Sequence, residues 1–152
     1  MTKVSLTSST IKVLALDFEG TLIANSSNLI PRPGLYEFLE WCKSQFERIV
    51  IYTCVEENKF RSIAGNLVQN KSVPPWFKDI GYIEWDGMIK DLYNIDGITP
   101  KQAILVDDAE IFILEAQKPQ WIKIKTFDLP YPADDNELLK VANIIEKNYL
   151  KL

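Results

Sequence analysis

Hydrophobic and polar positions follow two different periods along this chain, and their succession predicts strands alternating with helices. Short, almost uninterrupted apolar runs are typical of strands buried on both faces, and they occupy residues 11–17, 48–53 and 102–108. Shorter strands are expected near residues 81–85 and at residues 121–126. Strands of this kind, separated by helical segments, predict a parallel sheet with helices on both faces.

The helical segments are recognised by apolar residues three and four positions apart. One helix is expected to open at Pro33-Gly34, a second after Glu56-Glu57, and a third to occupy residues 135–149. A short helix is expected at residues 109–116, and a loop or small hairpin at residues 21–31. The fold class is therefore α/β and Rossmann-like.

Length and composition favour a single domain. A chain of 152 residues with 47% hydrophobic and 25% charged residues can form one sizeable core. We expect one domain over residues 1–152, with residues 1–10, rich in Ser and Thr, as a loose lead-in. No apolar stretch is long enough to span a bilayer and no signal-like segment opens the chain, so we expect a cytoplasmic protein with no membrane partner.

Charge and residue usage exclude several classes of function. The formal net charge is -4 and the basic residues are scattered, which argues against nucleic acid as a partner. The chain has no histidine, so Ser-His and Cys-His catalysis and Cys/His zinc sites are excluded. The only cysteines are Cys42 and Cys54, and we interpret Cys54 as a buried, unreactive thiol. Acid–base chemistry is left to carboxylates, Lys or Tyr.

Polar side chains end three of the predicted strands. Asp17 follows the first apolar run, Thr53 the second, and Asp107-Asp108 the third. Because ligands bind at the carboxyl ends of strands in an open parallel sheet, we expect these residues to meet at one rim. Lys90 lies in the preceding loop, and this set of oxygen ligands and an amine suits Mg²⁺ with a phosphoryl group.

These residues, in this order, resemble the four motifs of the haloacid dehalogenase (HAD) superfamily of phosphatases. The segments Pro31-Arg-Pro-Gly-Leu-Tyr-Glu-Phe-Leu39, Ile49-Val-Ile-Tyr-Thr53, Gly87-Met-Ile-Lys-Asp-Leu92 and Ile104-Leu-Val-Asp-Asp108 are similar to the small phosphatases that act on the RNA polymerase C-terminal tail. The similarity spans roughly residues 11 to 125. Receiver domains of two-component signalling use the same residue types, but there the acidic pair comes first, so the order favours the phosphatases.

The resemblance implies a role for each residue. Asp17 would attack phosphorus and form an aspartyl-phosphate. Asp17, the backbone carbonyl of Glu19, Asp107 and, directly or through water, Asp108 would hold Mg²⁺. Thr53 would hydrogen-bond a phosphoryl oxygen, while Lys90 would neutralise negative charge on the nucleophile and the phosphoryl group.

Three assignments have alternatives. Lys101 and Lys78 compete with Lys90, but Lys101 begins its strand and is therefore expected at the opposite rim. Asp108 is either a metal ligand or the N-cap of the helix expected at residues 109–116. Glu19 replaces the Asp that the family uses as general acid and base, and its extra methylene displaces the carboxyl group.

The substitution at Glu19 leaves three outcomes open. A shifted backbone restores the geometry, the enzyme is slow, or the hydrolytic step is lost, since a misplacement of about 1 Å can lower a rate by about 10²-fold. There is room for only a hairpin between Leu22 and Pro33, so we expect no cap domain over the site. The function expected is a phosphohydrolase for a phosphorylated protein or small molecule; the alternative is a weakly active or inactive domain that binds a phosphorylated partner.

Overall fold

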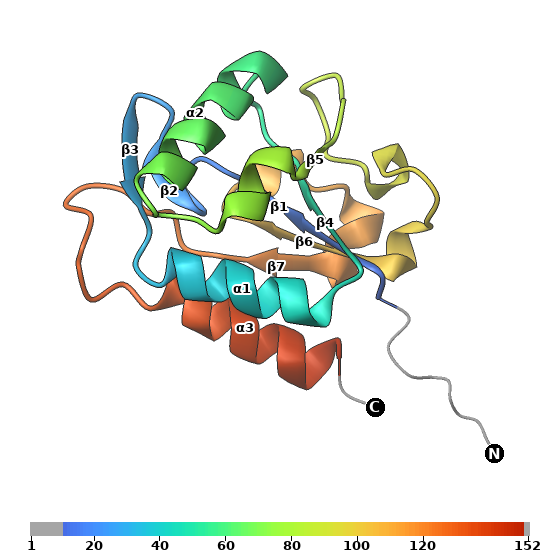
Figure 1. Ribbon diagram of the computed structural model, residues 1–152. Coiled ribbons are helices and arrows are strands. Elements are labelled where there is room, and N and C mark those ends of the chain that lie inside the picture. Colours follow the sequence, from blue (N-terminus) through green and yellow to red (C-terminus); the bar gives the residue numbers. More distant parts are fainter. Residues whose placement is uncertain (1–10, 151–152) are drawn as a thin grey trace.

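A parallel five-stranded sheet forms the centre of the computed structural model, which describes residues 11–150 (Figure 1). The strand order is β5-β4-β1-β6-β7, and every neighbouring pair is parallel. The strands are β1 (Val13–Leu16), β4 (Arg48–Ile51), β5 (Gly81–Tyr82), β6 (Ala103–Asp107) and β7 (Trp121–Lys123). The predicted sheet is confirmed, whereas the lead-in expected at residues 1–10 lies outside the described residues.

Three α-helices cover one face of the sheet. They are α1 (Leu35–Gln45), α2 (Glu57–Gln69) and α3 (Glu137–Asn148), and Figure 1 shows α1 and α3 side by side. Their apolar stripes pack with Leu14 and Leu16 of β1 in a single buried cluster. In α1 the buried residues are Leu35, Phe38, Leu39 and Cys42, the spacing that places side chains on one side of a helix.

The opposite face of the sheet is covered without an α-helix. Val13 and Ala15 of β1 pack there against Ile83, Leu92 and Ile113, which belong to the long connection between β5 and β6 and to the segment after β6. These segments contain short 3-10 helices at Leu92–Asn94, Pro100–Gln102, Glu110–Phe112 and Glu115–Gln120. Both faces are therefore covered by helices, as predicted, although the helices on this face are short 3-10 helices of three to six residues.

A hairpin occupies the segment between β1 and α1. It consists of β2 (Ile23–Asn25) and β3 (Asn28–Pro31), and it is the small insertion expected after the first strand. Between α2 and β6 the described chain carries only β5, the loop that contains Lys90 and short 3-10 helices, the first at Pro75–Asp79. Neither connection forms a cap domain, so the carboxyl ends of the strands are left open.

Two local expectations were met only in part. The strand expected near residues 81–85 is limited to β5, because the chain leaves the sheet and the Trp85 indole turns to donate a hydrogen bond to the Thr53 carbonyl at 2.8 Å. The helix expected at residues 109–116 is replaced by two 3-10 turns separated by extended residues Ile113 and Leu114. The Phe112 carbonyl in this segment accepts a hydrogen bond from the Lys90 N–H at 2.8 Å instead of continuing a helix.

Candidate active site

Asp17 lies at the carboxyl end of β1, at the centre of the sheet. Its backbone N–H donates to the Val106 carbonyl at 2.9 Å, which continues the pairing of β1 with β6. Its side chain is only 10% exposed, and both carboxylate oxygens are engaged. Thr21 donates its hydroxyl to Oδ2 at 2.8 Å, while the Lys90 ammonium donates to Oδ1 at 3.0 Å. The carboxylate is thereby held in one orientation.

The Lys90 ammonium is buried between two carboxylates. It donates to Asp17 Oδ1 and to Asp107 Oδ2, and its side chain is 1% exposed. The rings of Tyr52, Trp85 and Phe112 surround it, with centroids 6.0, 5.6 and 5.3 Å from Nζ. Aromatic faces attract a cation and exclude water, so the ammonium interacts with the carboxylates in a region of low dielectric.

Lys90 is the lysine that the structure places at this rim. Lys101 lies exposed in the 3-10 helix that precedes β6, and therefore at the opposite edge, as expected. Lys78 is exposed in the 3-10 helix Pro75–Asp79. Neither competitor forms an ion pair within residues 11–150.

Three aspartates bring their carboxylates together beside Lys90. Asp17, Asp107 and Asp108 each place an oxygen within 4.8 Å of the others. Three carboxylates and one ammonium leave a formal charge of -2 at the site, which a divalent cation would neutralise. Oxygen ligands of this kind are those that Mg²⁺ prefers, so the residues present fit a magnesium ion.

Gly20 allows the turn that follows Asp17 to approach this cluster. Its φ of +77° lies in the left-handed region, where side chains are strained. A Cβ atom at this position would lie 2.7 Å from Asp108 Oδ2 and 3.2 Å from the Thr126 methyl group. Both the conformation and the close contact therefore require glycine between Asp17 and Thr21.

Burial governs the ionisation of these groups. The pKa of Asp17 lies well above its ordinary value, chiefly because burial removes the carboxylate from water. The attraction of Lys90 opposes this increase, whereas the charges of Asp107 and Asp108 add to it. Desolvation likewise raises the pKa of Asp107 against the attraction of Lys90. Burial alone would lower the pKa of Lys90, but Asp17 and Asp107 outweigh it and raise that pKa. The ammonium is therefore retained, while the carboxylates require further positive charge to remain fully ionised together.

Thr53 follows β4 and lies next to β1. It is 1% exposed, and its Oγ1 accepts a hydrogen bond from the Val55 N–H at 3.1 Å. That bond uses a lone pair of the hydroxyl oxygen and leaves the O–H proton available as a donor. The structure thus places Thr53 at the same rim as Asp17 and Asp107, as the strand ends predicted.

Of the four predicted carboxylates, Glu19 is the one whose side chain lies outside the acidic cluster of Asp17, Asp107 and Asp108. Its Oε2 accepts a hydrogen bond from the Ser26 N–H, in the turn of the β2–β3 hairpin, at 2.5 Å. Within the described part of the chain, no hydrogen bond reaches Oε1. The longer side chain of Glu19 therefore fixes the hairpin with one oxygen and keeps the other free.

The local geometry decides against the N-cap interpretation of Asp108. Asp108 Oδ2 accepts a hydrogen bond from the Thr126 hydroxyl at 2.8 Å, and the following 3-10 helix has no side-chain cap. The backbone N–H of Ala109 is instead bound by Asp107 Oδ1 at 2.8 Å. Asp108 is therefore a member of the acidic cluster with Asp17 and Asp107, and not a helix cap.

A model of the NLI interacting factor-like phosphatase family matches residues 12–151. The chain belongs to this family. The match confirms the resemblance to HAD-superfamily phosphatases of the type that acts on the RNA polymerase C-terminal tail. No curated protein matches the chain. Membership identifies a phosphatase fold of the HAD type.

Two residues that support the site of this NLI interacting factor-like phosphatase were missed in the sequence. Gln117 is buried and bridges the Lys90 loop: its Oε1 accepts from the Leu92 N–H at 2.9 Å, and its Nε2 donates to Asp91 Oδ1 at 2.8 Å. The Tyr52 hydroxyl donates to the Asp91 carbonyl at 2.8 Å. These bonds fix the segment Asp91-Leu92, which directly follows Lys90.

Arg32 is the second missed residue. Its buried guanidinium donates to the carbonyls of Gly20 at 3.2 Å, Thr21 at 3.2 Å and Lys125 at 2.6 Å. It also binds both oxygens of the Asp135 carboxylate, at 2.9 and 3.0 Å. Its only signal in the sequence is an arginine enclosed by two prolines, and nothing local indicates Asp135, which lies 103 positions away.

An open cavity of about 620 Å³ adjoins Thr53. Tyr82 and Trp85 line it together with four carboxylate side chains, those of Glu56, Glu57, Glu84 and Asp86. Cys54 also lines it and is exposed, so the expectation of a buried thiol was wrong. Partial desolvation and the nearby carboxylates of Asp17 and Asp107 raise the pKa of this thiol, which keeps it a weak nucleophile. None of the helices within residues 11–150 is long and apolar enough to cross a membrane.

Proposed function

We propose that this protein is a Mg²⁺-dependent phosphohydrolase that acts through an aspartyl-phosphate on Asp17. The observation that supports this most strongly is the arrangement around Asp17: a buried carboxylate fixed by Thr21 and Lys90, beside Asp107 and Asp108, in a member of a phosphatase family. Phosphoryl transfer depends mainly on positioning and charge stabilisation, and both are provided by these contacts.

In the first half of the proposed reaction, a carboxylate oxygen of Asp17 forms a bond to phosphorus. The bond from phosphorus to the ester oxygen breaks, and that oxygen takes a proton from the Glu19 carboxyl group. In the second half, Glu19 accepts a proton from water as the water oxygen attacks phosphorus. The Asp17–phosphorus bond then breaks, which releases phosphate and restores the Asp17 carboxylate.

Asp17, the backbone carbonyl of Glu19, Asp107 and Asp108 would hold the magnesium ion. The bound ion would supply positive charge to the phosphoryl oxygens. Thr53 would donate its free O–H to a phosphoryl oxygen. Lys90 would balance the negative charge that gathers on the phosphoryl group while keeping Asp17 in line.

The open rim favours a large substrate. Because neither connection within residues 11–150 forms a cap domain, a phosphorylated side chain on the surface of a protein can reach Asp17. Small phosphomonoesters would also enter. The acidic cavity beside Thr53 repels a polyphosphate backbone, so nucleic acid is disfavoured.

A second function is favoured by the contact between Glu19 and Ser26. If this bond holds the carboxyl group away from the leaving oxygen, the domain would bind a phosphorylated partner and turn it over slowly or not at all. The two functions predict opposite effects of Glu19→Asp on the rate of phosphate hydrolysis: a decrease for the enzyme and an increase for the binding domain.

Hydrolysis of p-nitrophenyl phosphate with Mg²⁺ tests the proposed enzyme. We expect turnover that chelation with EDTA abolishes and that Asp17→Asn removes. The matched control is Asp128→Asn, an exposed residue whose side chain has no hydrogen bond within residues 11–150. Turnover in Asp17→Asn equal to that of the wild type would disprove the assignment of Asp17.

A further inference from the structure

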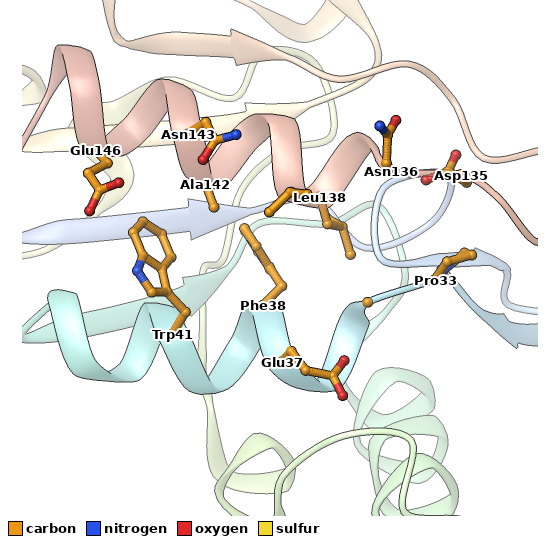
Figure 2. A pocket seen from close by; sticks show the side chains of 12 residues that line it. Pro33, Glu37, Phe38, Trp41, Asp135, Asn136, Leu138, Ala142, Asn143 and Glu146 are labelled. Carbon is orange, nitrogen blue, oxygen red and sulfur yellow. The ribbon is translucent and has the colours of Figure 1, made fainter.

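An apolar groove of about 510 Å³ runs between α1 and α3 (Figure 2). We call it the α1/α3 groove. Phe38 and Trp41 reach into it from α1, and Leu138 and Ala142 face them from α3. None of these four residues belongs to the candidate active site.

The groove residues recur at helical spacing on both helices. On α1 they are Glu37, Phe38 and Trp41, and on α3 they are Leu138, Leu139, Ala142, Asn143 and Glu146. Each helix therefore presents to the groove the edge of its buried stripe, Phe38 on α1 and Leu138 on α3, together with less buried neighbours such as Trp41 and Leu139. Leu139, in the α3 stripe, is 63% exposed, where a helix that faced only solvent would carry a polar residue.

Charge at the rim selects a kind of partner. Glu37 on α1 and Glu146 on α3 are exposed, and neither forms an ion pair or hydrogen bond within residues 11–150. Asp135 also lines the groove, but Arg32 neutralises it. The twelve lining residues include no lysine or arginine. An occupant with positive charge at its edges therefore complements this rim.

We propose that the α1/α3 groove binds a basic amphipathic helix of a partner protein. The two helices that form it have 11 and 12 residues, so they run roughly 16 to 18 Å, which matches about three turns of a partner helix. Apolar side chains at i, i+3 and i+4 would enter the groove, and flanking Lys or Arg residues would lie near Glu37 and Glu146.

The same charges disfavour other occupants. A second copy of this chain packed groove to groove with twofold symmetry would bring two acidic rims into one interface, with Glu37 and Glu146 contributed by each copy. An anionic membrane surface would be repelled by the same rim. The proposal is independent of the proposed function, because no residue of the groove is assigned to the phosphatase reaction.

A designed peptide tests the groove with the intact chain. The probe is an amphipathic helix of 14 residues built from Leu, Ala and Lys; one control has the same composition scrambled, and another has Lys replaced by Glu. Binding is measured by titration with ¹⁵N-labelled protein, so that shifted amide signals locate the peptide. We expect shifts concentrated on α1 and α3 with the basic helix only.

Two groups of variants make the test specific. Glu37→Lys combined with Glu146→Lys is expected to weaken binding by about tenfold, equivalent to about 1.4 kcal/mol, and Leu139→Ala is expected to weaken it as well. Asp96→Lys, an exposed charge reversal outside the groove, is the matched control and should leave binding unchanged. Hydrolysis of p-nitrophenyl phosphate should be unchanged in every variant.

Several results would overturn the proposal. They are shifts centred on the acidic cavity beside Thr53, equal binding of the acidic or scrambled peptide, or equal loss in Asp96→Lys. Sedimentation showing a dimer that Leu139→Glu disrupts would assign the groove to a second copy instead. A phosphatase assay without turnover would count against the proposed function and leave the binding result unaffected.

Discussion

Replacement of Arg32 by methionine removes five hydrogen bonds from the junction between the turn that follows Asp17 and the start of α3. The Arg32 side chain is 0% exposed and that of Asp135 is 7% exposed, so water can replace the lost contacts only in part, from the side of the α1/α3 groove that Asp135 lines. The variant leaves a buried carboxylate without its partner and the Gly20 and Thr21 carbonyls without a donor. Removing one member of a buried pair lowers the free energy of unfolding by about 3 to 5 kcal/mol.

The effect should also reach catalysis. Arg32 binds the carbonyl of Thr21, and the Thr21 hydroxyl orients Asp17. We therefore expect Arg32→Met to lower kcat for p-nitrophenyl phosphate by about tenfold or more, while Arg32→Lys, which keeps the charge, loses less of both stability and activity.

Urea unfolding followed by tryptophan fluorescence measures the change in stability. The control is Arg61→Met: Arg61 pairs with Glu57 at 3.2 Å on the surface, with side chains 32% and 41% exposed, so its loss should stay within about 1 kcal/mol. In Arg32→Met combined with Asp135→Asn, the loss should be smaller than the sum of the two single losses. A loss below about 1 kcal/mol for Arg32→Met, or strict additivity, would refute this explanation of the junction.

Three further predictions follow from individual contacts. Lys90→Met should lower kcat by about 10²- to 10³-fold, whereas Lys101→Met, at the opposite rim, should not change it; steady-state kinetics with equal effects would contradict the role of Lys90. Glu19→Asp should break the bond to Ser26 and lower kcat by about 10²-fold if Glu19 is the acid and base, while an increased rate would favour the binding function. Burial acts to raise the pKa of Asp135, but hydrogen bonds from Arg32 and from the Glu137 N–H outweigh it and hold that pKa below its ordinary value. Its contribution to stability is therefore complete above the unfolded pKa of about 4 and is lost as the pH falls through the lower folded pKa, so the difference between the urea midpoints of the wild type and Asp135→Asn should shrink as the pH is lowered below about 4. A constant difference across that range would contradict this pKa.

The sequence predicted the rim of the site well because strand ends are encoded locally. Apolar runs that stop at Asp17, Thr53 and Asp107 determine where β1, β4 and β6 deliver their polar residues, and the parallel order brings these ends together. Lys90 could be chosen over Lys101 by the same reasoning about edges of the sheet. The positions of polar residues at the ends of strands can therefore be predicted from the type and order of residues along the chain.

What surrounds the rim was not readable in this way. Arg32 and Gln117 act through partners 103 and 25 positions away, and no local pattern pairs them. No continuous helix forms at residues 109–116, because the Phe112 carbonyl accepts a hydrogen bond from the Lys90 N–H. This tertiary contact overrides helical propensity. Nor could the sequence show that Glu19 uses its extra methylene to reach Ser26.

Detection of a phosphorylated Asp17 tests the central claim most directly. The variant Glu19→Gln, which retains the length of the side chain but cannot accept a proton from water, is mixed with p-nitrophenyl phosphate and Mg²⁺, quenched in acid and digested with pepsin. Mass spectrometry should find one phosphoryl group on the peptide that contains Asp17, and none when Asp17→Asn is added. Product formation by the same protein with the phosphoryl group on another residue, or with no covalent adduct at any time, would contradict the claim.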